Sequence, residues 1–393
     1  MTGLSKIKHE ADAVWIEGVP VLKPKTALDL MLPTFAGALY AALSVTEHAV
    51  SYEDILGMSG LAFRVRWYVG EHGPTGCPCA PCGETKIVNA ALKKATGWQL
   101  RVVADNGWDT PQMQQLIPEI IKSINSGIPI TAVDRNLNSG VIYGYADDGE
   151  TFLVRTYYAA SLRCKLSKLG QKPALACFPG EHTQPLSLSE IFSDILQAAV
   201  EGWRSETYDT DPAASKLKSG RAALEAWINL LSNFEKISRN AKGFAVEPFS
   251  LLGFHVWAYQ HLFEARKAAA AFLRKNAGLI PAGKPDLLHA SENYQAESEL
   301  LASVLEDEKS IYPQQNSTIH SQIHFHGAWN KIAGFSIDRA DMLKALSVEE
   351  QKRSPDEVWQ PEARKVSKRI LEQALELENE AIGFIESALS SDG

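Results

Sequence analysis

The sequence predicts an α+β domain with an antiparallel sheet, followed by an all-helical domain. Two β-rich runs flank an Asp-Gly pair at residues 148 and 149, which is typical of an antiparallel hairpin. Helical periods dominate from residue 187 onward. The chain has 393 residues, more than one hydrophobic core usually organises. We therefore expect two domains, at residues 1–182 and 187–393.

Local signals in the first part indicate a mixture of helices and strands. Pro33 precedes an apolar stretch that predicts a helix from Thr34 to about Val45. Ser51, with Asp54 three positions on, indicates the start of a second helix. Three further elements follow along the chain: a strand at 98–105, a helix at 111–127 that ends at Gly127, and a strand at 128–134.

The clearest local signal is GVIYGYADDGETFLVRTYY, at residues 140–158. Asp-Gly is favoured in two-residue hairpin turns because both turn positions need a positive φ. The pattern therefore predicts strands near 140–146 and 151–157, joined by a two-residue turn at Asp148 and Gly149.

The second part reads as a set of amphipathic helices. The segment SLSE at 187–190 has the form of a capping box, and apolar residues then recur on one helical face. Residues 365–389 carry a long stretch with the same periodicity. Trp227 and Trp257 occur at helical spacing and are expected in the core. We expect roughly five or six helices and almost no strand after residue 187.

Composition and charge narrow the classes of function. The net charge of -8 and the pI near 5.8 disfavour a nucleic-acid partner, because neutralising phosphates needs a basic surface. The longest apolar stretch contains Pro33 and is shorter than a membrane span, so we expect no membrane segment. Five clustered cysteines do not form a secreted disulfide framework, and no signal peptide is visible. The expected location is the cytoplasm.

Cys77, Cys79 and Cys82 lie within GCPCAPCGETKIVNAALKK, directly before a predicted helix. In one interpretation the three thiolates bind Zn²⁺ or another soft metal, with His72 as a fourth ligand. In another, Cys82 is a catalytic nucleophile, because a helix N-terminus stabilises a thiolate, although Glu84 opposes this. In the third, the segment is a proline-rich loop with reduced thiols and no chemical role.

Two other polar clusters are candidate metal sites. In HSQIHFHG, at residues 320–327, His320 and His324 would share one face of a helix. The carboxylates of ELENE, at 376–380, would need ligands from a neighbouring helix, and His289 with Glu292 offers a pair three residues apart. In both cases a solvated polar face is the plainer interpretation.

Three segments carry a resemblance to a known family: TFAGALYAALSV at 34–45, SYEDILGMSGLAFR at 51–64 and SGVIYGYADDG at 139–149. Their order resembles the papain-like fold of bacteriocin-leader-processing cysteine peptidases. It is more similar to the N-terminal domain of the butirosin biosynthesis protein H family, which are acyltransferases. The resemblance covers about a third of the chain and implies a papain-like N-terminal domain.

The catalytic groups that this resemblance implies are absent. The family's nucleophilic Cys begins the buried helix, but here that stretch is Thr34 to Ala38. The family's His corresponds to Asn138, and its acidic residue falls near Arg155 and Thr156. Papain-type chemistry needs a thiolate in contact with an imidazole, so we expect no such peptidase activity.

The positions singled out by this comparison become candidate ligand-binding residues: Thr34, Asn138, Tyr143 and Tyr145. One hypothesis is a ligand-binding protein or partner subunit on a degenerate papain-like fold. The alternative is an acyltransferase or amide hydrolase whose nucleophile or metal lies in the Cys77–Cys82 loop, near the mouth of the cleft. The expected partners are a small molecule or an acyl or peptide group, with a homodimer also considered.

Overall fold

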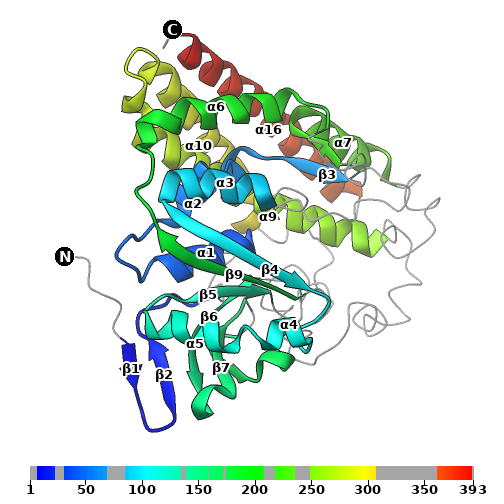
Figure 1. Ribbon diagram of the computed structural model, residues 1–393. Coiled ribbons are helices and arrows are strands. Elements are labelled where there is room, and N and C mark those ends of the chain that lie inside the picture. Colours follow the sequence, from blue (N-terminus) through cyan, green and yellow to red (C-terminus); the bar gives the residue numbers. More distant parts are fainter. Residues whose placement is uncertain are drawn as a thin grey trace. The chain divides into compact units, whose positions relative to one another are not determined.

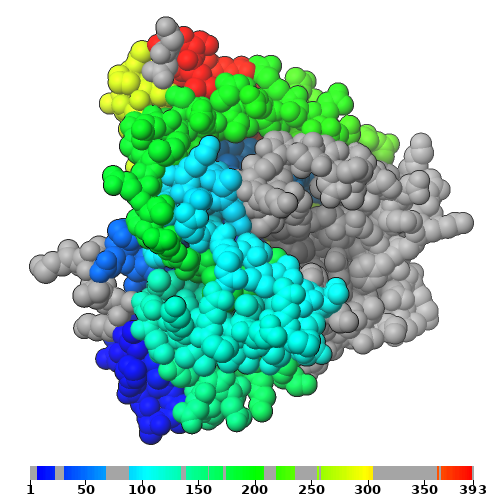
Figure 2. Space-filling model, viewed as in Figure 1, coloured from blue at the N-terminus to red at the C-terminus, as the bar shows by residue number. Residues whose placement is uncertain are grey.

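The computed structural model describes residues 7–22, 31–68, 85–133, 139–157, 159–170, 174–207, 217–234, 248–306 and 361–391. Its elements are drawn in Figure 1, and Figure 2 shows the same view with space-filling atoms. The chain divides into two compact units. Unit 1 comprises Met1–Ile55 and Lys86–Ser187, and unit 2 comprises Leu56–Thr85 and Leu188–Gly393. The molecule is mixed helix and antiparallel sheet, with a helix-rich C-terminal region.

The centre of unit 1 is an antiparallel sheet (Figure 1). Its strands run in the spatial order β1-β2-β6-β5-β9-β4, and β7 pairs with both β6 and β8. The strands are β1 (Ile7–His9), β2 (Ala13–Ile16), β4 (Trp98–Asp105), β5 (Ile130–Val133), β6 (Ser139–Ala146), β7 (Thr151–Arg155), β8 (Leu162–Cys164) and β9 (Ala174–His182). Strand β6 is the branch point, because β7 lies on one side of it and β5 and then β2 lie on the other.

Three helices accompany this sheet in the described part of unit 1, and a fourth precedes its edge strand. Helix α1 (Thr34–Leu43) packs on β5 and β6 and buries eight of its ten residues, as its apolar composition predicts. Helix α4 (Pro111–Gln114) leads into α5 (Ile117–Asn125), which packs on β2, β5 and β6. Helix α3 (Thr85–Thr96) precedes β4. The strand expected at 98–105 is confirmed over its whole length.

The hairpin between β6 and β7 is confirmed, but its predicted two-residue turn is wrong. Ala146 pairs with Thr151, so four residues connect the strands. Asp147–Gly149 forms a 3₁₀ turn, and Asp147, Asp148 and Gly149 all have positive φ (52°, 53° and 92°). The Asp-Gly signal therefore marked the left-handed backbone correctly but missed that Asp147 also belongs to the connection.

The single helix expected at 111–127 is also corrected. The structure has α4 and α5 separated at Gln115 and Leu116. Pro118 lies in the first turn of α5, where its missing N–H costs nothing, and this favours a new helix start. Ile120 and Ile124 face the core as predicted, and Gly127 follows the helix with φ 76°. The helical periodicity of the apolar residues is therefore confirmed, but the sequence pattern did not predict the break between α4 and α5.

Unit 2 contains α6 (Leu188–Arg204), α7 (Gly220–Ser232), α9 (Pro248–Asn276), α10 (Lys284–Glu306) and α16 (Pro361–Ser390). Helix α10 packs along both α9 and α16. The long helix expected at 365–389 is confirmed. Helix α2 (Tyr52–Met58) ends in this unit, and the hydroxyl oxygen of Ser51 accepts from the Asp54 N–H at its start, as expected.

The expectation of an almost strand-free second half needs one correction. Strand β10 (Leu217–Ser219) pairs antiparallel with β3 (Arg66–Tyr68). The helix-rich unit therefore includes a segment from the first part of the chain. Trp67 of β3 stacks on Trp227 of α7, with ring centroids 4.8 Å apart. Trp227 is 1% exposed, in agreement with its expected core position. The side chain of Trp257 lies outside the described residues.

In the LGMSG segment at residues 56–60, the glycine at position 57 is required by close packing. A Cβ at Gly57 would lie 2.3 Å from ring atoms of Phe272, so only glycine lets α2 approach α9 this closely. The 3₁₀ turn η1 (Leu61–Phe63) follows, and Phe63 contacts the rings of Phe272 and Tyr294. Gly57 therefore serves packing inside unit 2.

In the described residues, no helix is both long and apolar enough to cross a membrane.

Candidate functional site

Thr34 occupies the position at which the family resemblance implies a nucleophile. It is the first residue of α1, and Pro33 before it supplies no side-chain cap. The Oγ1 atom of Thr34 accepts a hydrogen bond from the backbone N–H of Ser139, at 3.2 Å. Ser139 is the first residue of β6 and is 8% exposed. The start of α1 and the start of β6, distant in sequence, therefore meet at this hydroxyl.

No described histidine of unit 1 can act as a base for Thr34. His48 follows the C-terminal end of α1, and a ten-residue helix is about 15 Å long. His9 lies in register with Val14 on β2, and Val14 pairs with Tyr145. Tyr145 is six residues beyond Ser139, about 20 Å along β6. A general base must lie within about 3 Å of the proton it removes.

His182, the remaining histidine of unit 1, is stacked on His48. The ring centroids lie 3.5 Å apart and the planes are nearly parallel, at 5°. The Trp98 Nε1–H donates to the His48 carbonyl oxygen at 3.4 Å, and His182 Nε2 lies 3.1 Å from the Thr96 carbonyl oxygen. Burial and then the neighbouring His48 lower the pKa of His182. Parallel stacked rings cannot direct both lone pairs at one metal ion, so this pair is structural.

Arg155 stands where the family would have an acid. It ends β7, opposite Val141, and its guanidinium carbon lies 4.9 Å from the centroid of the Tyr143 ring. The Tyr143 hydroxyl lies 3.2 Å from the Ser161 Oγ. A cation over an aromatic face stabilises the hairpin, but it does not orient an imidazole as an acid would.

The two candidate tyrosines have different surroundings. Tyr143 is 7% exposed, next to a bulge between Ile142 and Gly144, and lies about 13 Å along β6 from Ser139. Tyr145 is half-buried and donates to the Asn125 Oδ1 of α5 at 3.1 Å. The structure therefore brings Thr34 to the start of β6 and holds the tyrosines farther along it. A binding role for Tyr143 and Tyr145 stays a prediction.

Several predicted site residues lie outside the described residues: Asn138, His72, Cys77, Cys79, Cys82 and the histidines of 320–327. Among the residues that the structure describes, no group of three or more His, Cys, Asp or Glu side chains could hold a metal ion. Cys177 is a described thiol in β9, and burial raises its pKa to about 12. A thiol of this kind is inert, because the thiolate is the nucleophile.

A groove of about 400 Å³ lies between α6, α7 and α16 in unit 2. Its charged lining residues are Arg204, Glu206, Arg221, Glu225 and Glu386. Arg204 donates twice to Glu386, at 2.5 Å for both contacts, and Arg221 donates to Glu225 at 2.7 Å. Gly383 lines the same groove, and a Cβ there would meet no atom within 4 Å. The groove thus offers open space bordered by both signs of charge.

A buried ionic cluster joins α9, α10 and α16. Arg266 donates from Nε to the Glu378 Oε1 at 2.5 Å, and its Nη1 donates to the Ala62 carbonyl oxygen at 2.8 Å. Its Nε also lies 3.5 Å from the Glu297 Oε2. All three side chains are 0% exposed. Glu378 belongs to the ELENE segment, so the structure assigns that carboxylate to an arginine and not to the suggested pair of His289 and Glu292.

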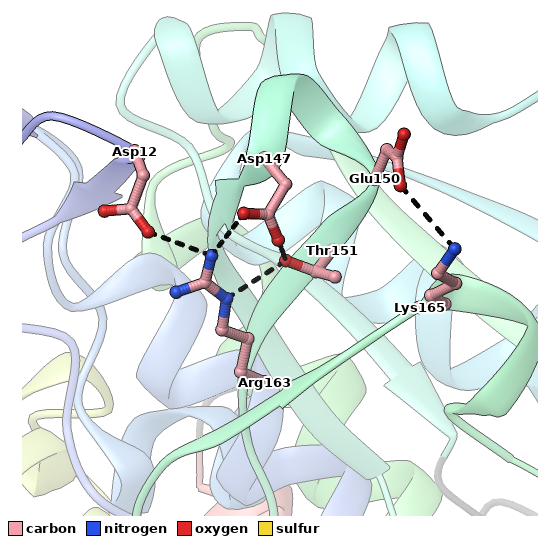
Figure 3. A network of polar contacts seen from close by, with 6 residues as sticks. All are labelled: Asp12, Asp147, Glu150, Thr151, Arg163 and Lys165. Atoms are coloured by element: carbon pink, nitrogen blue, oxygen red, sulfur yellow. Dashed lines mark hydrogen bonds and ion pairs between the residues drawn. The ribbon is translucent and has the colours of Figure 1, made fainter.

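An exposed ionic network joins two turns of unit 1 (Figure 3). Arg163 of β8 donates to Asp12, between β1 and β2, at 3.0 Å, and to Asp147 at 2.7 Å. Asp147 also accepts from the Thr151 hydroxyl at 2.8 Å. Lys165 and Glu150 form a separate contact of 3.6 Å nearby. The hydrogen bonds to Thr151 and then to Arg163 lower the pKa of Asp147.

Comparisons of the chain with protein-family models and with curated proteins give no match. The sequence does not predict the groove or the buried cluster, because both assemble from helices far apart along the chain. The signal in the sequence was the row of glutamates on 376–386, of which Glu378 joins the buried cluster and Glu386 lines the groove.

Proposed function

We propose that this chain is a ligand-binding or partner protein on a papain-like fold that has lost its thiol chemistry. The observation that carries the proposal is the hydrogen bond from the Ser139 N–H to the Thr34 hydroxyl oxygen. At the position of the nucleophile there is a hydroxyl group that serves as a structural acceptor, and no described imidazole of unit 1 lies beside it. An alcohol needs an adjacent base to become a nucleophile.

The groove of unit 2 supports a binding role for a small polar molecule. Its volume falls in the range of small-molecule sites, which is roughly 300–1,000 Å³. Both arginines of the lining face glutamates, so a ligand with one sign of charge would leave part of the lining unmatched. A zwitterion, such as a free amino acid, can oppose both signs at once. We therefore assign the ligand to this chemical class.

Gly383 gives a direct test of the groove. Gly383→Phe should fill it, because the added side chain enters space with no atom within 4 Å of its Cβ. Replacing a glycine inside a helix also favours folding, by up to about 1 kcal/mol. Gly278→Phe is the matched control, since Gly278 is another open position in unit 2 but does not line the groove.

The measurement is the shift in melting temperature of the full chain with each of the free amino acids at about 10 mM, a concentration that stabilises a protein with millimolar affinity. At least one amino acid should stabilise the native chain and Gly278→Phe, and should fail to stabilise Gly383→Phe. Equal shifts in the two variants would exclude the groove. No shift with any amino acid would exclude the zwitterion class.

A further inference from the structure

Among the described strands, β4 is the longest edge strand of the sheet in unit 1. Among the described strands it pairs only with β9, and it has eight residues, Trp98–Asp105. The other edge strands, β1 and β8, have three residues each. The cyan part of the chain, which includes β4, reaches the surface in the space-filling view (Figure 2). An edge strand presents a row of backbone donors and acceptors that another strand can use.

The side chains of β4 do not protect this edge. The segment WQLRVVAD contains neither proline nor lysine, the residues that commonly block edge pairing. Leu100, Val102 and Val103 are only half-buried, and Ala104 is exposed. Residues two apart share a face, so Arg101, Val103 and Asp105 lie on the same face of the strand. Their charges are arranged symmetrically about Val103, with a cation on one side and an anion on the other.

We propose that two copies of this chain pair antiparallel through β4, with Val103 on the two-fold axis. In this register Val103 lies opposite the partner's Val103. Arg101 lies opposite the partner's Asp105, and Asp105 lies opposite the partner's Arg101. Directly opposed charges of opposite sign stabilise antiparallel strands, and the two-fold axis makes the same pair twice. Centring the axis between Val102 and Val103 would place Arg101 opposite an alanine and lose both pairs.

Both charged side chains are already held in place within one copy. The Arg101 guanidinium carbon lies 4.5 Å from the centroid of the Phe178 ring, and the same side chain is paired with Glu119. Asp105 accepts from the Asn106 N–H and from the Thr110 hydroxyl, each at 2.6 Å. Arginine has five donors, so the contact with Glu119 leaves others for a second carboxylate.

Charge reversal tests the register. Arg101→Asp should place like charges opposite each other twice, and Asp105→Arg should do the same with cations. Each single variant should therefore lower the dimer association constant at least tenfold. The double variant should restore it. An equimolar mixture of the two single variants should form a heterodimer, because each strand then opposes its complement. Circular dichroism of every variant checks that the chain remains folded.

Sedimentation velocity on the full chain, up to about 100 µM, reports the mass of the assembly and its concentration dependence. A native chain that stays monomeric over this range would overturn the proposal. A native dimer that both single variants retain would also overturn it, because the interface would then lie elsewhere.

A symmetric cross-link gives an independent readout. Val103→Cys should form a disulfide-linked dimer under mild oxidation, since residues on the two-fold axis face their own copies at disulfide distance. Ala104→Cys is the matched control, because in this register it opposes Val102 and should cross-link much less. Equal cross-linking of the two variants would contradict the Val103-centred register.

Discussion

Each unit places one arginine between two carboxylates, but the two groups differ in their exposure to solvent. In unit 1, Arg163 contacts Asp12 and Asp147, and the three side chains are 43%, 60% and 44% exposed. In unit 2, Arg266 contacts Glu297 and Glu378, and all three are 0% exposed. The first network joins surface turns, whereas the second lies in the core between three helices and also holds the Ala62 carbonyl oxygen.

The difference shows that burial, more than the number of ion pairs, sets the energetic consequence. Water screens the exposed network and competes for each charge. In the buried cluster, two carboxylates and a guanidinium have lost their hydration, so each group depends on its neighbours. Glu297 also shares a hydrogen bond with Glu378, so the two acids depend on each other as well as on Arg266. Removing the guanidinium therefore leaves two buried acids without a cation.

The largest predicted effect follows from removing the buried cation. Arg266→Met keeps much of the side-chain volume but leaves Glu378 without its guanidinium and the Ala62 carbonyl oxygen without its donor. We expect a loss of about 3–5 kcal/mol in the free energy of unfolding, measured by urea denaturation. Arg163→Met is the matched exposed control. Equal losses in the two variants would contradict the distinction between the networks.

Glu297 gives the second prediction, because it makes the stability depend on pH. Burial, and then the neighbouring Glu378, raises the pKa of Glu297 well above its usual value. A folded-state pKa above the unfolded value of about 4.3 means that its contribution is complete below that pH. The contribution is lost as the pH rises toward the folded-state pKa. The native chain should therefore lose stability on this account between mildly acidic and neutral pH.

Glu297→Gln should remove this loss, because the amide resembles the protonated acid. We expect the variant to be more stable than the native chain at pH 7, by roughly 1–3 kcal/mol, and to match it near pH 4. Urea denaturation at several pH values measures the difference. A variant that is less stable than the native chain at pH 7 would show that an ionised Glu297 is needed for the fold.

His182 should make the stability depend on pH in the opposite direction and more weakly. The folded-state pKa of His182 is lowered, by burial first and by His48 second. Its contribution is therefore present above the unfolded value of about 6.5 and is lost as the pH falls. His182→Gln should flatten the fall in stability below pH 6.5, measured by urea denaturation at several pH values. If His182→Gln loses stability with falling pH as steeply as the native chain, the stacked histidines do not cause that loss.

The smallest effect is expected in the exposed network. Arg163→Met should change the urea midpoint little at low salt, because water already solvates all three partners. Adding salt should remove even that change, since surface pairs are screened within a few ångströms at 1 M ionic strength. A large destabilisation that persists in high salt would mean that the network fixes the two turns in Figure 3 by more than charge.

Local signals predicted the parts of the fold that depend on neighbours in sequence. Strand β4 and helices α1 and α16 follow directly from composition and periodicity. The break between α4 and α5 and the four-residue loop after Ala146 were missed, because each depends on one residue, Pro118 or Asp147, within a longer consistent pattern. The pairing of β10 with β3 depends on tertiary contacts that no local window contains.

The candidate site was likewise predicted only where local sequence signals suffice. The family resemblance indicated position 34 and the region of residue 138, and the hydrogen bond between Thr34 and Ser139 joins neighbouring positions. The partner of Glu378 could not be inferred, since Arg266 lies 112 residues away and arginine has no fixed spacing to a buried acid. The groove likewise needs the assembled positions of α6, α7 and α16.

The proposed loss of thiol chemistry is tested most directly by intact-protein mass spectrometry after brief incubation of the full chain with an activated acyl thioester. A catalytic cysteine forms a covalent acyl adduct, whereas a binding protein of the kind proposed does not. We predict an unchanged mass, with only slow labelling of accessible thiols. A rapid adduct of one acyl group per chain, mapped to Cys82 or a neighbouring cysteine, would contradict the proposal and establish a relocated nucleophile.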